Sequence, residues 1–331
     1  MPNISEVARL AGVSTATVSK YLNGVKVRED NAKAIDAAVR ELNYHPNDFA
    51  RGLRTNKSMT VGVILPELDN LFFTSIISSV DEVLDAAGYS TLVCICHSDV
   101  EREGRKLDFL RRKKIDGLIA VPCSAASDFV RNLDGLPVVL IYRMSGIGSC
   151  CCVMSDNVSA AYGAAESLIS AGHKKIGLLL GPDSNYTPIE RRSGFLAACA
   201  ANNIELRGEY IRSGPYYIES GYRMTRELLA LPEPPTAIFA TNNELTIGAL
   251  NALSESGLTL GRDISFIGFD CELVARAVNP PLTVVVQRVY EIGRAAADTL
   301  LSLISGEIMQ NKAIRIPTEL RLGKSVCRAK N

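Results

Sequence analysis

From Thr60 onward, short apolar runs rich in β-branched residues alternate with longer amphipathic segments. The runs are TVGVIL, STLVCIC, GLIAVPC, PVVLIYR, KIGLLLGP, TAIFATN and ISFIGFD. Segments between them, such as FFTSIISSVDEVLDAAG, YGAAESLISAG and ELTIGALNALSESG, have helical periodicity, and each ends at a glycine, a common helix stop. This alternation of strand and helix predicts parallel, doubly wound sheets.

The apolar runs are too numerous for one compact sheet. The late segment TVVVQRVYEIGRAAADTLLSLISG is expected to return to the first part of the fold, so we expect two successive α/β lobes. Ligands of open α/β sheets bind beyond the carboxyl ends of the strands, which places the expected ligand site in the cleft between the lobes. The loops expected to face this cleft follow Leu65, Pro122, Arg143, Gly181, Asn242 and Asp270.

The first 46 residues follow a different pattern, typical of three short helices. In VARLAGVSTATVSKYLNG, Val7, Ala8 and Leu10 form an apolar stripe. Gly12 then permits a turn with positive φ, and Ser14 is a favourable N-cap for a second helix. This spacing predicts a helix-turn-helix, a motif that lays its second helix in the major groove of DNA.

The predicted second helix exposes small polar side chains and one long cation, which suit a groove. Its exposed positions would be Thr15, Ala16, Thr17, Ser19 and Lys20, whereas Val18 and Leu22 pack inward. The segment EDNAKAIDAAVRELNY predicts a third helix that closes a small core and ends at Pro46. The polar stretch HPNDFARGLRTNKS is too poor for a core and is expected to be a linker, with one conditional helix from Asn47 to Leu53.

The net charge of zero hides an asymmetry between these regions. Through residue 60 the chain has nine Lys and Arg against six Asp and Glu, a net charge of +3, and the remainder has 27 against 30. A charge of +3 is modest for a DNA-binding protein, because phosphate contacts supply most of the non-specific affinity. We therefore expect a homodimer, which doubles the charge and reads a pseudo-palindrome.

Several classes of protein are disfavoured by what the chain contains. Its apolar runs fall short of the roughly 18 residues of a membrane span, and its first residues lack the hydrophobic centre of a secretory signal, so a bacterial cytoplasmic location at the nucleoid is expected. The nine cysteines have no CxxC spacing and are expected to be reduced and mostly buried. With scattered histidines and no GxGxxG, Walker, GxSxG or HExxH motif, we expect no cofactor, no metal and no catalytic activity.

Polar and aromatic side chains follow several of the predicted strands. Aromatic faces that stack on a ring, with Arg, Asn and Asp bonding to hydroxyls, are typical of a site for a small polar ligand. Ordinary alternatives are core aromatics, a solvated helix charge at the arginine and a helix cap at the aspartate. The candidates are Phe72, Phe73, Arg191, Tyr216, Asn242 and Asp270.

These segments, in this order, resemble the lactose-repressor/galactose-repressor (LacI/GalR) family of bacterial transcription regulators over essentially the whole chain. The resemblance rests on ISEVARLAGVSTATVSKYLNG, LNYHPNDFARGLRTNKSMTVGVILPELDNLFF, SDN, SLISAGHKKIGLLLGP, RRSGF, AIFATNNELTIGAL, ISFIGFD and PPLTVVVQ. It implies a DNA-binding domain at 1–46, a hinge helix and linker at 47–59 and a core at 60–331 similar to periplasmic sugar-binding proteins. The first lobe would span about 60–157 and 288–317, and the second about 158–287 and 318–331.

The resemblance also implies roles for individual residues. Base contacts fall on Thr15, Ala16 and Lys20, and Leu53 corresponds to a leucine that wedges into the minor groove. The wider set of DNA contacts adds Ser14, Thr17, Ser19, Asn23, Tyr44 and Arg54. The effector contacts coincide with the six strand-end candidates, and the implied effector is a sugar or sugar derivative that switches the DNA affinity of a repressor of a catabolic operon.

Two other classes of protein share parts of this pattern. A sugar-binding protein of the transport type would have the same core, but it needs export and lacks a helix-turn-helix. An α/β sugar-processing enzyme would need a paired base and nucleophile or a metal set. The lack of a signal peptide and the first 58 residues argue against the transport protein, and the lack of such a catalytic or metal set argues against the enzyme.

Overall fold

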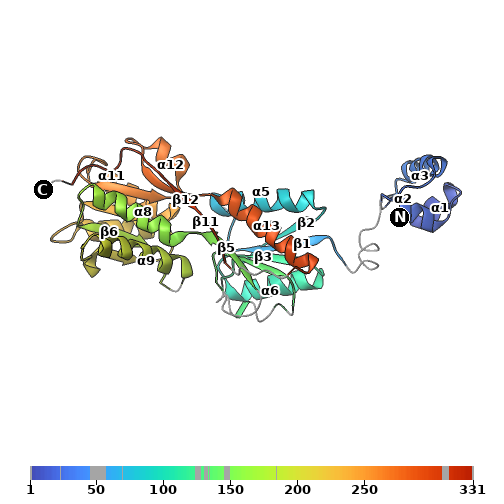
Figure 1. Cartoon of the computed structure of the whole chain (residues 1–331), viewed down its shortest axis with the longest axis horizontal. Helices are drawn as coiled ribbons and strands as arrows, with labels where there is room; N and C mark the ends of the chain where they lie inside the picture. The colour runs from blue at the N-terminus through green and yellow to red at the C-terminus, as the bar shows by residue number, and fades with distance from the viewer. Residues whose placement is uncertain are drawn as a thin grey trace. The chain divides into compact units, whose positions relative to one another are not determined.

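The computed structural model describes residues 2–22, 24–44, 57–68, 70–123, 128–129, 133, 135–144, 150–183, 185–307 and 313–329 (Figure 1). The chain divides into two compact units, Met1–Ser58 and Met59–Asn331. The division falls inside the segment 47–59 that the sequence predicts as hinge and linker. The expected hinge helix and the residues Asn23, Leu53 and Arg54 lie outside the described residues.

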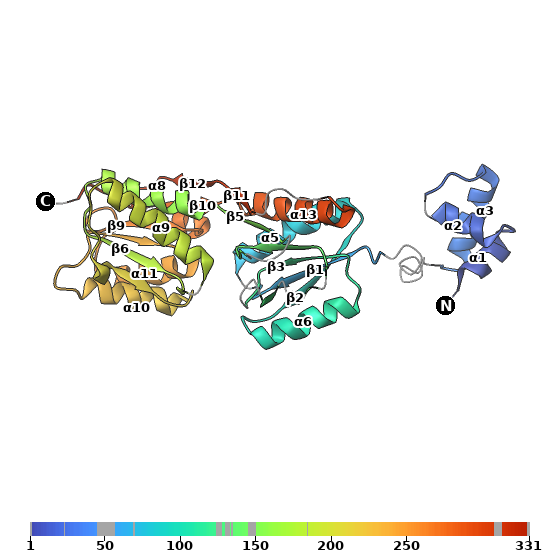
Figure 2. The same cartoon turned by 60° about the horizontal axis from the view of Figure 1, so that its bottom comes forward.

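The N-terminal unit is a bundle of three helices, α1 (Ile4–Leu10), α2 (Thr15–Leu22) and α3 (Glu29–Glu41) (Figure 2). Its core is built around Val7, Val18 and Ile35, which are all fully buried. Helix α1 begins with a capping box, in which the Asn3 side chain accepts from the backbone N–H groups of Ser5 and Glu6, and Glu6 bonds back to the Asn3 N–H.

The turn between α1 and α2 is the predicted helix-turn-helix connection. Gly12 has a φ of 66°, in the left-handed region that glycine adopts without strain, and the Ser14 hydroxyl accepts a 3.1 Å hydrogen bond from the Thr17 N–H at the start of α2. The predicted end of the third helix at Pro46 is wrong. Helix α3 stops at Glu41 because the chain turns at Asn43, which has a φ of 45°.

The larger unit contains two lobes, each with a six-stranded sheet, as the strand count predicts. The first sheet has the order β11-β5-β4-β3-β1-β2. Helices α5 (Leu71–Ala86) and α13 (Val289–Ser305) cover one face, and α6 (Val100–Arg112) covers the other (Figure 2). The strands are β1 (Thr60–Leu65), β2 (Ser90–Ile95), β3 (Gly117–Ala120), β4 (Val138–Ile141), β5 (Cys151–Ser155) and β11 (Ala313–Ile316).

The second lobe repeats this plan with the strand order β12-β10-β9-β8-β6-β7. Helices α8 (Asn157–Ser170) and α9 (Tyr186–Ala201) cover one face, and α10 (Ile218–Leu229) and α11 (Asn243–Glu255) cover the other (Figure 2). A short helix α12 (Glu272–Ala277) and a 3-10 turn (Gly208–Tyr210) complete it. The strands are β6 (Ile176–Leu180), β7 (Ile211–Ser213), β8 (Ala237–Ala240), β9 (Ser265–Phe269), β10 (Thr283–Gln287) and β12 (Thr318–Arg321).

The chain crosses between the lobes three times, from β5 to α8, from β10 to α13 and from β11 to β12. The second of these crossings, from β10 to α13, is the return to the first lobe that we expect of the segment 283–306. Among the described strands, β12 is the one exception to the predicted parallel arrangement, because it pairs antiparallel with β10. The reason is the direct passage from β11 to β12: a strand that leaves one sheet at its carboxyl edge enters the facing sheet in reverse.

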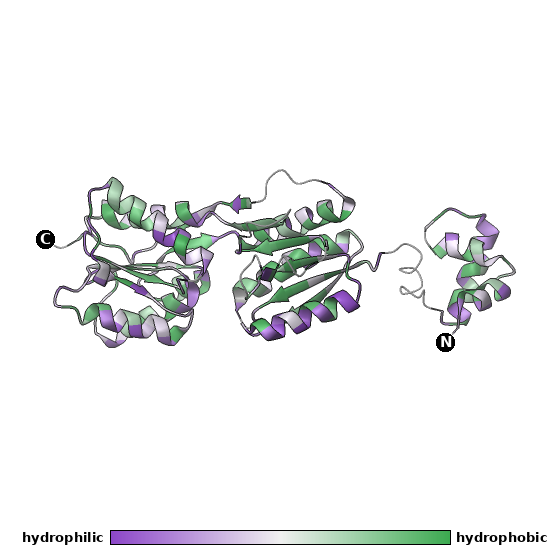
Figure 3. Cartoon of the chain, turned by 90° about the horizontal axis from the view of Figure 1, so that it is seen from below, coloured by the Kyte–Doolittle hydropathy of each residue, from purple (hydrophilic) through white to green (hydrophobic). Residues whose placement is uncertain are grey.

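The central strands of both sheets are buried on both faces, as helix-covered parallel sheets require, whereas the edge strands β2, β7, β11 and β12 are partly exposed. Figure 3 shows the strands of both lobes as largely hydrophobic, whereas the helices carry hydrophilic residues on their outer sides. All nine cysteines are free, and seven of them are buried, as predicted. None of the helices among the described residues is long and apolar enough to cross a membrane. The small helical domain followed by a two-lobed α/β core is the predicted fold class.

Candidate functional site

The outer face of α2 carries the side chains predicted to contact DNA. Thr15, Ala16 and Lys20 are exposed there, whereas the opposite side of the helix packs Val18 into the core. The hydroxyls of Ser14 and Thr17 lie 2.8 Å apart, and that of Ser14 caps the helix. These two side chains therefore stabilise the start of α2 in addition to any role at the surface.

Two other predicted DNA contacts are less accessible. Ser19 is half-buried on α2. Tyr44 is only 9% exposed and packs into the core of the helical unit after α3. Its predicted contact with DNA stays a prediction, beside this structural role.

A chain of hydrogen bonds links the carboxyl ends of strands from the two sheets. The Tyr142 hydroxyl, just after β4, donates 2.6 Å to Oε1 of Gln287, which ends β10. Gln287 donates through its side-chain amide and, at 3.3 Å, through its backbone N–H to the two carboxylate oxygens of Asp270. The Tyr142 oxygen also lies 3.0 Å from the Ser155 hydroxyl at the end of β5. These contacts place the edges of both sheets against one another.

Asp270 lies in an environment that opposes its charge. Burial raises the pKa of its carboxyl to about 6, although the Arg191 guanidinium and the Gln287 hydrogen bonds act in the opposite direction. Its φ of 60° and that of 58° at Tyr142 are left-handed, a backbone conformation that non-glycine residues adopt at a cost and that gathers at functional sites. The alternative of a helix cap does not describe Asp270, because its carboxylate bonds Gln287 and no side chain caps α12.

Arg191 is a buried side chain of α9 and is not a solvated helix charge. It is 3% exposed, and its guanidinium lies over the Phe269 ring with its carbon 3.8 Å from the ring centroid. Its Nε donates 2.9 Å to Asn157 Oδ1, and another nitrogen donates to the Thr241 carbonyl. A planar cation held this firmly, beside Asp270, is suited to bonding a ligand with fixed geometry.

Tyr216 enters the same region from the loop before α10. Gly181, at the end of β6, makes room for it, because a Cβ atom there would overlap the Tyr216 ring. The Tyr216 hydroxyl is buried and has no hydrogen-bond partner among the described residues. Burial raises the pKa of this phenol, while Arg191 and Arg143 oppose the rise. A buried hydroxyl without a partner costs free energy of about 1–3 kcal/mol, which a bound polar ligand can recover.

Phe72 and Phe73 supply the aromatic side of the first lobe. Both lie in the first turn of α5, half-buried against the core of that lobe. Their ring centroids are 5.3 Å apart at an edge-to-face angle, and the Phe72 ring is 5.4 Å from that of Tyr142. Phe72 therefore belongs both to the core, as the alternative suggested, and to the edge where the lobes meet.

Asn242 uses its polar atoms within the fold. Its Oδ1 accepts 2.9 Å from the Leu245 N–H and caps α11, and its amide donates to Glu244. The predicted bond to an effector would therefore compete with a helix cap. We interpret Asn242 first as the residue that holds the start of α11, and with it Glu244, in place.

Sequence reasoning missed several residues of this region. Tyr142 and Gln287 connect the two sheets, and Asn157 holds Arg191 through a bond of 2.9 Å. The lobes are further joined by an ion pair of 2.5 Å between Arg315 of β11 and Glu190 of α9. The available signal was position, because Gln287 ends a strand and Tyr142 follows one directly. Their side chains alone resembled ordinary strand and helix residues.

Two described cavities lie outside this group of residues. One of about 480 Å³ is lined by Ile95, His97, Arg102, Arg105, Lys106 and Phe109 beside α6. The other, of about 200 Å³, lies at the crossings between the lobes and is lined by residues that include Asp156 and Pro317. None of the six predicted effector contacts lines either cavity. The interlobe residues instead combine the buried Tyr216 hydroxyl, which has no hydrogen-bond partner among the described residues, with the Asp270 carboxyl of raised pKa, a combination typical of functional sites.

Comparison with known proteins adds independent information. Residues 3–47 match the model for bacterial regulatory proteins of the lacI family, and residues 165–326 match the model for a periplasmic binding protein-like domain. A curated relative is the HTH-type transcriptional repressor PurR of Actinobacillus pleuropneumoniae serotype 3 (strain JL03), which is 34% identical over 98% of each chain.

Solved structures agree with this match over nearly the full length. The lac repressor dimer bound to operator and the anti-inducer ONPF has a TM-score of 0.88 at 27% identity, covering 98% of this chain and 99% of the other. The complex of the transcriptional regulator CelR with cellobiose has a TM-score of 0.75 at 28% identity, covering 98% and 100%. The similarity therefore includes both the helical unit and the two-lobed unit.

Proposed function

Because the chain belongs to the lacI family of bacterial regulatory proteins, we propose that it represses transcription by binding an operator whose occupancy a small polar effector controls. The family assignment confirms the resemblance predicted from the sequence. It disfavours the transport-protein reading, because the match extends through the helix-turn-helix. The relatives are named as repressors and regulators, which also favours regulation over catalysis, and such a protein would act on DNA in the cytoplasm.

The DNA half of the proposal rests on the exposed face of α2. Lys20, as the long donor on this face, would bond to a guanine edge or to a nearby phosphate, and Thr15 and Ala16 would contact base edges, including thymine methyl groups. Leu53, in the expected hinge segment, would wedge into the minor groove at the centre of the operator and kink it.

We propose that the operator is pseudo-palindromic and that a homodimer reads it. One three-helix unit recognises few base pairs, and its segment of the chain has a net charge of only +3. Two units related by a two-fold axis would double both the charge and the sequence read. The lac repressor that this chain resembles was solved as a dimer on its operator.

The effector half rests chiefly on one observation, the buried Tyr216 hydroxyl without a hydrogen-bond partner among the described residues. Beside it lie the Arg191 guanidinium, which donates hydrogen bonds in fixed directions, and the Asp270 carboxylate, which accepts them. Hydroxyl groups of a sugar or sugar derivative could bond all three, and the apolar face of its ring could stack on Tyr216 or Phe72. The similar protein CelR was solved with cellobiose, and a sugar effector would fit control of a catabolic operon.

We propose that the effector acts by changing how the two lobes meet. A ligand that touches both lobes shifts their equilibrium only by the difference in its affinity for the two arrangements. The lobes are joined by three crossings, so they can rotate about them while the sheets stay intact. The first lobe follows the segment 47–59 in the chain, and its rotation in each protomer would alter the separation of the paired hinge segments and hence operator affinity.

The proposed function is tested by selection of DNA and screening of ligands on the full-length protein. Cycles of selection from random duplexes should enrich a pseudo-palindrome, and thermal-shift screening of a sugar and nucleoside panel should find an effector that changes its binding. A Lys20→Ala variant should fail to enrich the same sequence. Enrichment of no sequence by the dimer, or of a non-palindromic one, would contradict the DNA half. An effector that binds without changing operator affinity would contradict the switch.

A further inference from the structure

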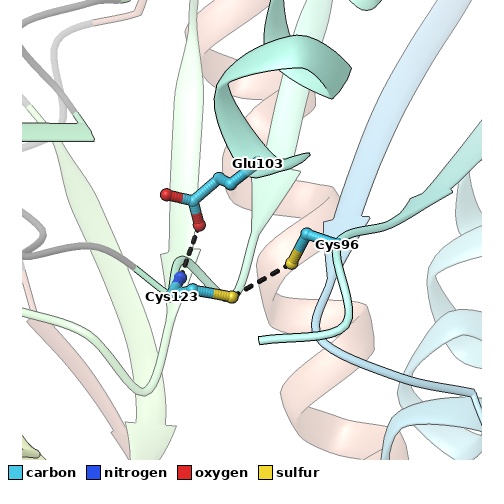
Figure 4. Close-up of side chains that lie close together, drawn as sticks. All are labelled: Cys96, Glu103 and Cys123. Carbon is cyan, nitrogen blue, oxygen red and sulfur yellow. Dashed lines mark hydrogen bonds between the residues drawn. The ribbon is translucent and has the colours of Figure 1, made fainter. Parts of the chain in front are cut away.

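Two cysteines and a glutamate meet at the carboxyl edge of the first sheet, outside the residues that the proposed function uses. Cys96 follows β2 and Cys123 follows β3, the two strands that flank β1. Glu103 comes from α6, which covers one face of that sheet, and Figure 4 shows its carboxylate directed toward the cysteines. The three side chains therefore come from three elements that the sheet topology brings together.

The donor atoms of this group lie close enough to share one ion. The two Sγ atoms are 3.0 Å apart, and the two sulfurs and a Glu103 oxygen all lie within 4.8 Å of one another. Cys96 is fully buried and Glu103 is 2% exposed, whereas Cys123 is partly exposed. The Glu103 carboxylate accepts a hydrogen bond from the Cys123 backbone N–H, which fixes its orientation (Figure 4).

We propose that Cys96, Cys123 and Glu103 bind one thiophilic divalent metal ion of the Zn²⁺ class. Two thiolates select a soft or borderline ion, and one carboxylate is a common third ligand of zinc. Tetrahedral bonds of about 2.3 Å to sulfur would hold the sulfurs about 3.8 Å apart. The free thiols must therefore separate by roughly 0.8 Å, which a small rotation of the partly exposed Cys123 side chain provides.

Three protein ligands leave a fourth coordination position open. Because Cys123 is partly exposed, water or a small exogenous ligand can reach the ion from that side. Binding releases the two thiol protons to solvent, so affinity for the ion rises with pH. We therefore expect the bound ion to exchange with metal ions in solution.

The charge of the surroundings matches such an ion. Two thiolates and a carboxylate carry −3, and a divalent ion contributes +2. The remaining charge is balanced by Arg143, whose Nε donates 3.2 Å to the Pro122 carbonyl next to Cys123. The positive charge of Arg143 also opposes the rise that burial causes in the pKa of Tyr216 in the other lobe. The metal ion would therefore lie near the effector region, although none of its three protein ligands is a predicted effector contact.

A disulfide between the two cysteines is the main competing arrangement. It would need the sulfurs to approach to about 2.05 Å and would use only two of the three donors. A metal site accounts for the third donor as well, because the buried Glu103 carboxylate would then bind the ion beside the two sulfurs. No CxxC motif marks the two cysteines, which are 27 residues apart, and for want of such spacing no metal is expected from the sequence.

The test uses full-length, reduced protein without metal under anaerobic conditions, with Co²⁺ as the probe. The proposal expects one Co²⁺ per chain, a sulfur-to-cobalt charge-transfer band in the near ultraviolet and visible bands of tetrahedral cobalt, all displaced by Zn²⁺. Cys123→Ser should lose the band, and Glu103→Gln, which keeps a hydrogen-bond acceptor, should weaken binding at least about tenfold. The matched control is Cys94→Ser, which removes a buried thiol of β2 outside the group.

Operator binding and far-ultraviolet circular dichroism establish that each variant is folded. A wild-type protein without the charge-transfer band, or a band of equal strength in Cys123→Ser, would overturn the proposal. Peptide mapping after mild oxidation adds a second readout. Saturating Zn²⁺ should protect Cys96 and Cys123, and formation of their disulfide at the same rate with and without Zn²⁺ would also overturn it.

Discussion

The side-chain amide of Asn70 donates a 2.8 Å hydrogen bond to Glu244, and this bond joins the N-cap of α5 in one lobe to the first turn of α11 in the other. Asn70 also caps α5, because its Oδ1 accepts 2.9 Å from the Phe72 N–H. Burial raises the pKa of Glu244, so the proton on this carboxyl is held more tightly than in water. The contact ties the arrangement of the lobes to the helix that presents Phe72.

Asn70→Ser separates these two roles. Serine retains a cap oxygen for α5 but removes the amide that reaches Glu244. We expect effector affinity to fall by about 1–3 kcal/mol, the usual worth of a hydrogen bond to a carboxylate, with little change in thermal unfolding. Calorimetry with the identified effector measures this. Unchanged affinity would mean that the contact does not support the ligand-bound arrangement.

Lys20→Ala should weaken specific operator binding by about 1–3 kcal/mol, because its long cation reaches a base edge or phosphate from the exposed face of α2. Lys33→Ala is the control, since Lys33 is an exposed lysine of α3 that pairs with Glu29 at 2.9 Å. Fluorescence anisotropy with a labelled operator compares the two. Equal losses in both variants would point to general charge rather than recognition by α2.

Leu53→Ala should reduce affinity for the operator while leaving weak binding to random DNA unchanged. Only a kinked operator uses an apolar wedge, whereas non-specific binding depends on phosphate contacts. Titrations on operator and on scrambled duplex at the same salt concentration provide the comparison. The same fractional loss of affinity on both duplexes would contradict the insertion of Leu53 into the minor groove of the operator.

Asp270 predicts a pH dependence of stability. Its pKa rises from an ordinary 3.8 to about 6 on folding, so between about pH 4 and pH 6 the folded state binds more protons than the unfolded state. The free energy of unfolding should therefore fall as pH rises through this window, by at most about 3 kcal/mol. Asp270→Asn should flatten the decline and leave the part due to Glu244. Denaturant titrations at several pH values measure it, and an unchanged slope would contradict the buried environment.

Much of the fold could be predicted from the sequence because its signals are local. Apolar runs of strand length mark the strands, and Gly12 with Ser14 marks the helix-turn-helix. The exceptions have local causes that a pattern does not reveal. Asn43 ends α3 early by adopting a left-handed conformation, and β12 runs antiparallel because it follows β11 directly across the lobes.

The candidate site was predictable only in part. Strand-end positions pointed to Arg191, Tyr216 and Asp270, which the structure places in one region. Their partners were not predictable, because contacts such as that between Tyr142 and Gln287 join residues 145 positions apart. Whether a polar side chain faces a ligand or caps a helix, as Asn242 does, depends on backbone geometry that composition does not encode.

Tyr216→Phe tests most directly the central claim that a ligand held between the lobes controls DNA binding. The substitution removes only the buried hydroxyl that lacks a partner among the described residues, so the free protein should be at least as stable and should bind operator with unchanged affinity. Operator titrations with and without the identified effector, on wild type and Tyr216→Phe, should show a wild-type response and a variant that needs roughly five times more effector. An unchanged effector response in Tyr216→Phe, and again in Arg191→Ala, would place the effector elsewhere and contradict the account.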